Sequence, residues 1–155
     1  MKIRTATLDD VSLIFSFIQK KSEFDCNIGA FSGVLQVSEA KLRKTLFGMP
    51  PFAYVLFAEV SSQAIGFALY GFRYSSFAGQ PSIWLDDLYV DEVMRSQGVG
   101  AALMAQLAAI AREHDCSHLA WNADARNTDG LRFYRRLGAE VTEKHGNRCV
   151  LKWVP

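Results

Sequence analysis

The segment RSQGVG, Arg95 to Gly100, places an arginine and two glycines directly before a long Ala/Leu-rich stretch. That stretch has helical periodicity, with Leu103, Leu107 and Ile110 on one face. Backbone N–H groups at the start of a helix have no intrahelical partner and lie at the positive end of the helix dipole. Glycines let an anion approach these groups closely, and Arg95 could add a charge-assisted contact. The spacing therefore indicates a site for a phosphate or a similar anion.

Two common phosphate-binding motifs do not fit this segment. A P-loop needs Gly-Lys-Ser/Thr, and no lysine follows Gly100. A dinucleotide-binding fingerprint needs a third glycine or alanine at the position of Leu103, and it usually opens a repeated βαβ array. Without further features the loop could equally be a tight turn into a helix. Its meaning depends on the elements around it.

The first half of the chain predicts a strand, two helices and a β-hairpin. A helix over 9–21 begins after Thr7, and Ser38 caps a shorter helix over 39–48. Strands are expected at 2–6, 52–60 and 64–72, and irregular segments at 22–37 and 73–81.

The second half predicts a strand at 82–90, a helix at 101–115 and a strand at 117–123. The intervening helix provides the crossover that a parallel strand pair needs. A helix over 127–138, with Asn127 as its cap and Gly138 at its end, precedes a closing hairpin of strands 139–144 and 148–154. Residues 1–155 are therefore expected to form one mixed α+β domain around one sheet.

Composition narrows the functional class. The 155 residues carry 17 basic and 16 acidic side chains, which gives no sign of a nucleic-acid-binding surface. Cys26, Cys116 and Cys149 are odd in number and widely spaced, so free thiols are expected, and no Cys/His spacing suits a metal. No signal-like or membrane-spanning apolar segment is present. A cytoplasmic protein with no metal, membrane or nucleic-acid partner is expected.

Two segments, DDLYVDEVMRSQGVGAAL and NTDGLRFYRRLGAE, together resemble the GNAT superfamily of acetyl-CoA-dependent N-acetyltransferases. The acetyl-CoA motif of that family, Arg/Gln-x-x-Gly-x-Gly/Ala after a central strand, is matched by Arg95, Gly98 and Gly100. A family helix with an Asn and FY-x-x-x-G matches residues 127–138. Within the superfamily, residues 66–90 are similar to the diamine (spermidine/spermine-type) acetyltransferases, which have LEDFFV where this chain has LDDLYV.

The resemblance implies a fold and a place for acetyl-CoA. The fold would be a mostly antiparallel twisted sheet with one parallel pair splayed into a V, flanked by about four helices. Acetyl-CoA would lie in the split, and the protein would be a homodimer. The implied cofactor-binding residues are Leu88, Tyr89 and Val90 for the pantetheine, Arg95, Ser96, Gln97, Gly98, Val99, Gly100 and Ala101 for the pyrophosphate, Asn127 and Gly130 beside the pantetheine, and Tyr134 near the sulfur.

Acetyl transfer to an amine needs a neutral amine, a stabilised oxyanion and a proton for the leaving thiolate. An alkylammonium has a pKa of ~10.4, so its deprotonation at pH 7 costs roughly 4–5 kcal/mol. Asp86 and Asp87 are the candidate proton acceptors, and strand alternation predicts that they face opposite sides of the sheet. Tyr134 matches the family tyrosine that protonates the thiolate.

The acceptor is expected to be a small primary amine, either a polyamine or a lysine-like amino acid such as thialysine, acetylated directly in a ternary complex. Glu23 and Asp25 fall where the diamine branch has acidic residues, and Trp121 and Asn122 could line the acceptor side together with Asp87. Two alternatives remain open. Residues 23–37 are less acidic than a polyamine site should be, which allows acetylation of a protein or peptide. The second alternative is a non-catalytic acyl-CoA sensor, and the presence of Asp87 and Tyr134 argues against it.

Overall fold

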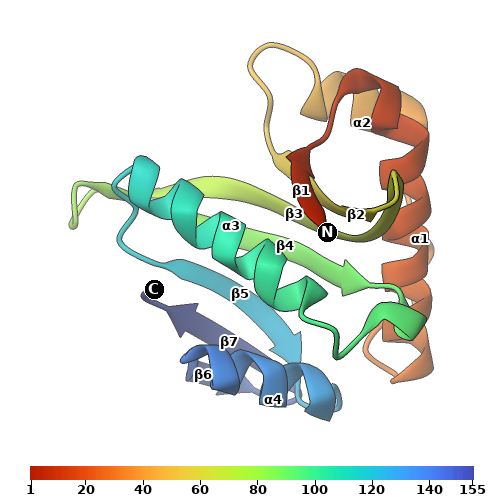
Figure 1. Cartoon of the computed structure of the whole chain (residues 1–155). Coiled ribbons are helices and arrows are strands. Elements are labelled where there is room, and N and C mark those ends of the chain that lie inside the picture. Colours follow the sequence, from red (N-terminus) through yellow and green to blue (C-terminus); the bar gives the residue numbers. More distant parts are fainter.

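Seven strands form one sheet in the order β1-β2-β3-β4-β5-β7-β6, in a computed structural model that describes residues 1–155 (Figure 1). Every neighbouring pair is antiparallel except β4 and β5, which are parallel. The strands are β1 Lys2–Thr5, β2 Tyr54–Val60, β3 Gln63–Ser75, β4 Gln80–Val90, β5 Leu119–Asp124, β6 Glu140–His145 and β7 Arg148–Trp153. The helices are α1 Val11–Asn27, α2 Glu39–Leu46, α3 Val99–Glu113 and α4 Thr128–Leu137. The predicted mixed α+β architecture with one parallel pair is confirmed.

Two hydrophobic clusters lie on the two faces of the sheet. Alternation along β2 separates them: Leu56 and Ala58 join the cluster of α3 and α4, whereas Val55 and Phe57 join that of α1 and α2. Burial of a large apolar side chain contributes about 1.5–3 kcal/mol, so these clusters hold the helices against the sheet. No helix is long and apolar enough to cross a membrane.

The parallel strands β4 and β5 separate soon after they meet. Their register contains only two pairs, Ile83 with Leu119 and Trp84 with Ala120. Beyond this point β4 stays paired with β3 and β5 stays paired with β7. The carboxyl-terminal half of β4 therefore has a free edge facing β5, which confirms the predicted V.

A β-bulge corrects the expected arrangement of the two adjacent aspartates. Leu69 pairs with Asp87 and Tyr70 pairs with Leu85, which leaves Asp86 as an extra residue. Leu85 and Leu88 consequently both pack in the cluster of α3, although strict alternation would place them on opposite faces. Because the bulge shifts the phase of β4, the alternation argument fails at this point.

Three helix caps match the sequence predictions, but several element boundaries do not. The Ser38 hydroxyl accepts from the Lys41 N–H at 3.2 Å, the Asn127 side chain accepts from the Gly130 N–H at 3.0 Å, and Gly138 has φ of 94°. Helix α1 continues through Asn27, because no breaker occurs before Gly29 with its φ of 79°. Similarly, β3 and β4 extend through most of the expected loop at 73–81.

We expect Asp10→Asn to lower the free energy of unfolding at pH 7 by about 1–3 kcal/mol. The Arg4 guanidinium donates two hydrogen bonds to the Asp10 carboxylate, at 2.7 and 2.9 Å, and holds the pKa of Asp10 below its usual range. This stabilisation is complete above the unfolded-state pKa of about 3.9 and disappears as pH falls through the lower folded-state pKa. Urea unfolding should therefore show a difference from wild type that shrinks on acidification. An equal loss in the control Asp9→Asn, which changes an exposed neighbour, would contradict this assignment.

Candidate active site

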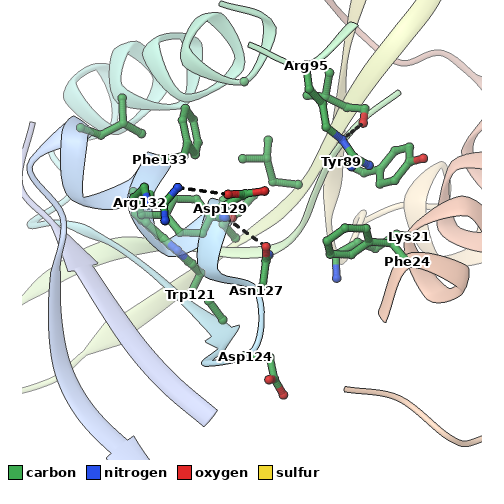
Figure 2. A pocket seen from close by; sticks show the side chains of 18 of the residues that line it. Lys21, Phe24, Tyr89, Arg95, Trp121, Asp124, Asn127, Asp129, Arg132 and Phe133 are labelled. Carbon is green, nitrogen blue, oxygen red and sulfur yellow. Dashed lines mark hydrogen bonds and ion pairs between the residues drawn. The ribbon is translucent and has the colours of Figure 1, made fainter. Parts of the chain in front are cut away.

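A cleft of about 950 Å³ occupies the split between β4 and β5. One wall comes from the end of α1 and from β4, the other from β5 and α4, and the start of α3 closes the cleft between them. Figure 2 shows the side chains that line it, with Lys21, Phe24 and Tyr89 on one side and Trp121, Asn127 and Phe133 on the other. No cluster of three or more His, Cys, Asp and Glu side chains could hold a metal ion.

The first turn of α3 presents free N–H groups at the cleft. The Ala102 N–H donates to the Gly98 carbonyl at 3.0 Å, so the N–H groups of Val99, Gly100 and Ala101 have no intrahelical partner. No side chain caps this terminus, unlike those of α2 and α4. The turn contains only small or apolar side chains, so an anion could reach the positive end of the helix dipole.

Two glycines shape that turn in different ways. Gly98 has φ of 83°, a left-handed conformation that a residue with a side chain adopts only with strain. Gly100 lies under the Phe133 ring, 3.1 Å from where a Cβ would stand. The predicted pyrophosphate segment lines the cleft from Arg95 to Ala101 except for Gln97, whose amide donates instead to the Val93 carbonyl at 3.0 Å.

The Arg95 side chain fixes the glycine segment to its surroundings. Its Nε donates to the Val90 carbonyl at 2.9 Å, as drawn in Figure 2. Its guanidinium lies 5.1 Å from the Phe24 ring centroid and 5.4 Å from that of Tyr89. Arg95 therefore ties the end of β4 and the end of α1 to the start of α3, a structural role that the sequence did not indicate.

The two aspartates of β4 have different environments. Asp86 is exposed and lines the cleft. Asp87 is half-buried and, unlike Asp86, is not among the residues that line the cleft. Its carboxylate makes no hydrogen bond within the chain, and burial raises its pKa to about 6. The positive charge of Lys21 opposes this rise, whereas Asp86 and Asp25 add to it. A carboxylate that titrates near neutrality can take up and release a proton under ordinary conditions.

Tyr134 lies in the opposite wall, against Trp121. The two ring centroids are 4.9 Å apart, and only 9% of Tyr134 is exposed. Burial raises the pKa of Tyr134 well above its usual value, and the charges of Asp87 and Asp25 act in the same direction. The phenol therefore stays protonated at neutral pH. It makes no hydrogen bond within the chain, so its proton is available to a group in the cleft.

The remaining predicted residues are only partly brought together. Asp25, Trp121 and Asn122 line the cleft, as do Leu88, Tyr89, Val90, Asn127 and Gly130. Trp121 is also a core residue, and its buried indole N–H has no partner. Glu23 is exposed and does not line the cleft, so the structure does not support its predicted place at the acceptor.

Sequence reasoning missed Lys21, which lines the cleft and forms an ion pair with Asp25. The spacing of four residues would have indicated this pair, but the helix was expected to end at Lys21 itself.

Comparison with known proteins identifies similar chains. The model of the family described as "Acetyltransferase (GNAT) family" matches residues 24–139. The chain is 32% identical to the thialysine N-epsilon-acetyltransferase of Bos taurus, over 95% of this chain and 89% of that protein. It is 28% identical to the human spermidine/spermine N(1)-acetyltransferase-like protein 1, over 89% of this chain and 20% of that protein. The crystal structure of PaiA N-acetyltransferase from Thermoplasma acidophilum in complex with coenzyme A has a similar fold, with a TM-score of 0.78 and 16% identity over 97% of this chain and 96% of that chain.

Proposed function

The chain belongs to the acetyltransferase (GNAT) family, and we propose that it transfers the acetyl group of acetyl-CoA directly to a primary amine of a small molecule. The observation that supports this most strongly is the split between β4 and β5. It brings an uncapped helix N-terminus, the Asp86 carboxylate and a protonated phenol to one cleft, and Asp87, with a pKa of about 6, lies next to Asp86 on β4. The names of the relatives, thialysine and spermidine/spermine acetyltransferases, favour a small amine as acceptor.

Acetyl-CoA fits the cleft as the donor substrate. Its pyrophosphate would accept hydrogen bonds from the free N–H groups of Val99, Gly100 and Ala101. Its pantetheine would pair with the free edge of β4 at residues 88–90, where β5 has turned away. Asn127 and Gly130, at the start of α4, line the same space.

The transfer step needs two proton movements. The amine nitrogen bonds to the acetyl carbon as the carbon–sulfur bond breaks. Asp87 accepts the proton of the amine, directly or through water, and Tyr134 gives a proton to the departing thiolate. The pKa of Asp87, about 6, is closer to that of an amine than an ordinary aspartate's is, so this carboxylate is the better base. Asp86, which is exposed in the cleft, attracts the cationic form of the acceptor.

The family resemblance also leads us to propose a homodimer in the cytoplasm. The absence of disulfides among Cys26, Cys116 and Cys149 agrees with a reducing compartment. Sedimentation of the purified protein tests the dimer.

We expect Gly98→Ala to weaken coenzyme A binding about tenfold, the equivalent of one charge-assisted hydrogen bond. Alanine at a positive φ is strained by about 1–2 kcal/mol, and here the strain falls on the residue that directs the N–H groups of α3. Gly79→Ala is the matched control, because Gly79 has φ of 64° and, like Gly98, nothing within 4 Å of an added Cβ. Urea unfolding should show similar losses of stability in both variants, and calorimetric titration should show weaker binding only for Gly98→Ala. Equal affinity in the two variants would remove this turn from the binding site.

The proposed function is tested by release of coenzyme A thiol from acetyl-CoA with a panel of amines: spermidine, putrescine, lysine, thialysine and short peptides. Mass spectrometry of the amines then identifies the product. Turnover with a small amine supports the proposal. Turnover with peptides alone would make the protein a peptide acetyltransferase, and binding of acetyl-CoA with no turnover would make it a sensor.

A further inference from the structure

An ion pair lies on the wall of the cleft where the sequence suggested acidic residues alone. Lys21 and Asp25 are one turn apart on α1, both line the cleft, and their side chains are 23% and 26% exposed. Because Lys21 pairs with Asp25, a diamine whose distal ammonium bound Asp25 would leave Lys21 beside a second cation with no anionic partner of its own. The wall instead presents one positive and one negative group side by side.

The pair lies within electrostatic reach of the proposed base. Lys21 and Asp25 of α1 both shift the pKa of Asp87, as does the neighbouring Asp86 of β4. Asp25 and Asp87 also act on Tyr134 of α4. Between the two charged residues of α1, the Phe24 ring lines the cleft and offers an apolar surface to methylene groups. A molecule anchored on the pair would therefore lie along Phe24, in the same cleft as Asp86 and Tyr134.

We propose that the Lys21–Asp25 pair binds the zwitterionic head of an α-amino acid, so that the enzyme acetylates the side-chain amine of a lysine-like amino acid in preference to a polyamine. This inference rests on the proposed function. Lys21 binds the α-carboxylate and Asp25 binds the α-ammonium, so both charges of the wall keep partners. A polyamine brings only cations, which Lys21 repels. Lys21 thus determines acceptor specificity by binding the carboxylate of the acceptor.

Lysine and cadaverine test this directly, because cadaverine is lysine without its carboxylate. The kcat/KM of the wild-type enzyme should be about tenfold or more higher for lysine than for cadaverine, since only lysine offers a partner to Lys21. Lys21→Met should remove most of this preference, and Lys21→Glu should reverse it. Lys44→Met is the control, because it removes an exposed lysine from α2, away from the cleft, and should leave the ratio unchanged.

Thermal unfolding of each variant shows whether a loss of specificity is only a loss of fold. The ratio of kcat/KM for lysine to kcat/KM for cadaverine, measured on one enzyme preparation, does not depend on the fraction of active enzyme. A wild-type preference for cadaverine or spermidine would overturn the inference while leaving the acetyltransferase intact. An unchanged lysine/cadaverine ratio in Lys21→Met would do the same. If no amine were acetylated by the wild type, the proposed function itself would fail, and the inference with it.

Discussion

Asp87→Asn should lower kcat/KM for the acceptor amine by about two to three orders of magnitude at pH 7, the usual contribution of a general base. Asn cannot accept the proton of the amine, yet it has nearly the same shape as Asp. Because Asp87 must be ionised to act, the wild-type rate should fall as pH drops through about 6, and the residual rate of the variant should lack this step. Rates of thiol release between about pH 5 and pH 9 measure both effects, in a range that spans this pKa.

Stability measurements distinguish this loss from unfolding. Burial raises the folded-state pKa of Asp87, so the ionised carboxylate costs stability. That cost develops as pH rises from the unfolded-state pKa of about 3.9 to about 6 and is complete above it. Asp87→Asn should therefore unfold at pH 7 with a free energy equal to or higher than that of wild type. Asp86→Asn is the matched control. It should keep most of kcat while raising KM for the amine, because Asp86 attracts the acceptor but does not take its proton. It should also move the fall in rate at acidic pH to lower pH, because the Asp86 charge contributes to the raised pKa of Asp87. Wild-type activity in Asp87→Asn would contradict the assignment of the base.

Tyr134→Phe should lower kcat by about 10- to 100-fold, with little change in KM for the amine. The hydroxyl has no partner in the chain and is held protonated by burial, so its removal takes away the proton for the thiolate and disturbs little else. Tyr70→Phe is the control, because Tyr70 is equally buried but does not line the cleft. Steady-state thiol release with both substrates varied separates kcat from KM. If the two variants behaved alike, Tyr134 would be a packing residue.

Local patterns predicted much of the fold. The caps at Ser38 and Asn127, the glycine turn and the parallel crossover all follow from signals within a few residues of one another. The end of α1 at Asn27 was missed, because residues 22–27 have no strong helix-forming pattern and the helix continues simply because no breaker precedes Gly29.

The arrangement of the site was less accessible from the sequence. The bulge at Asp86 depends on how β4 pairs with β3, and no property of LDDLYV distinguishes a bulged from a regular strand. The ion pair of Lys21 with Asp25, the engagement of Arg95 by two rings and the displacement of Glu23 from the cleft all depend on where α1 ends and how it packs. The candidate bases and the candidate acid were therefore recognisable from the sequence, whereas the different environments of Asp86 and Asp87 and the charges of the α1 wall required the three-dimensional structure.

In the proposed mechanism, acetyl-CoA and the amine meet in one cleft, and the acetyl group passes directly between them. Initial rates of thiol release, measured with acetyl-CoA and lysine each varied at several fixed concentrations of the other, test this mechanism most directly. Direct transfer predicts reciprocal plots that intersect, and an unchanged mass of the protein after incubation with acetyl-CoA alone. Parallel lines, together with a stable acetyl group on the protein, would show a covalent intermediate and contradict the account.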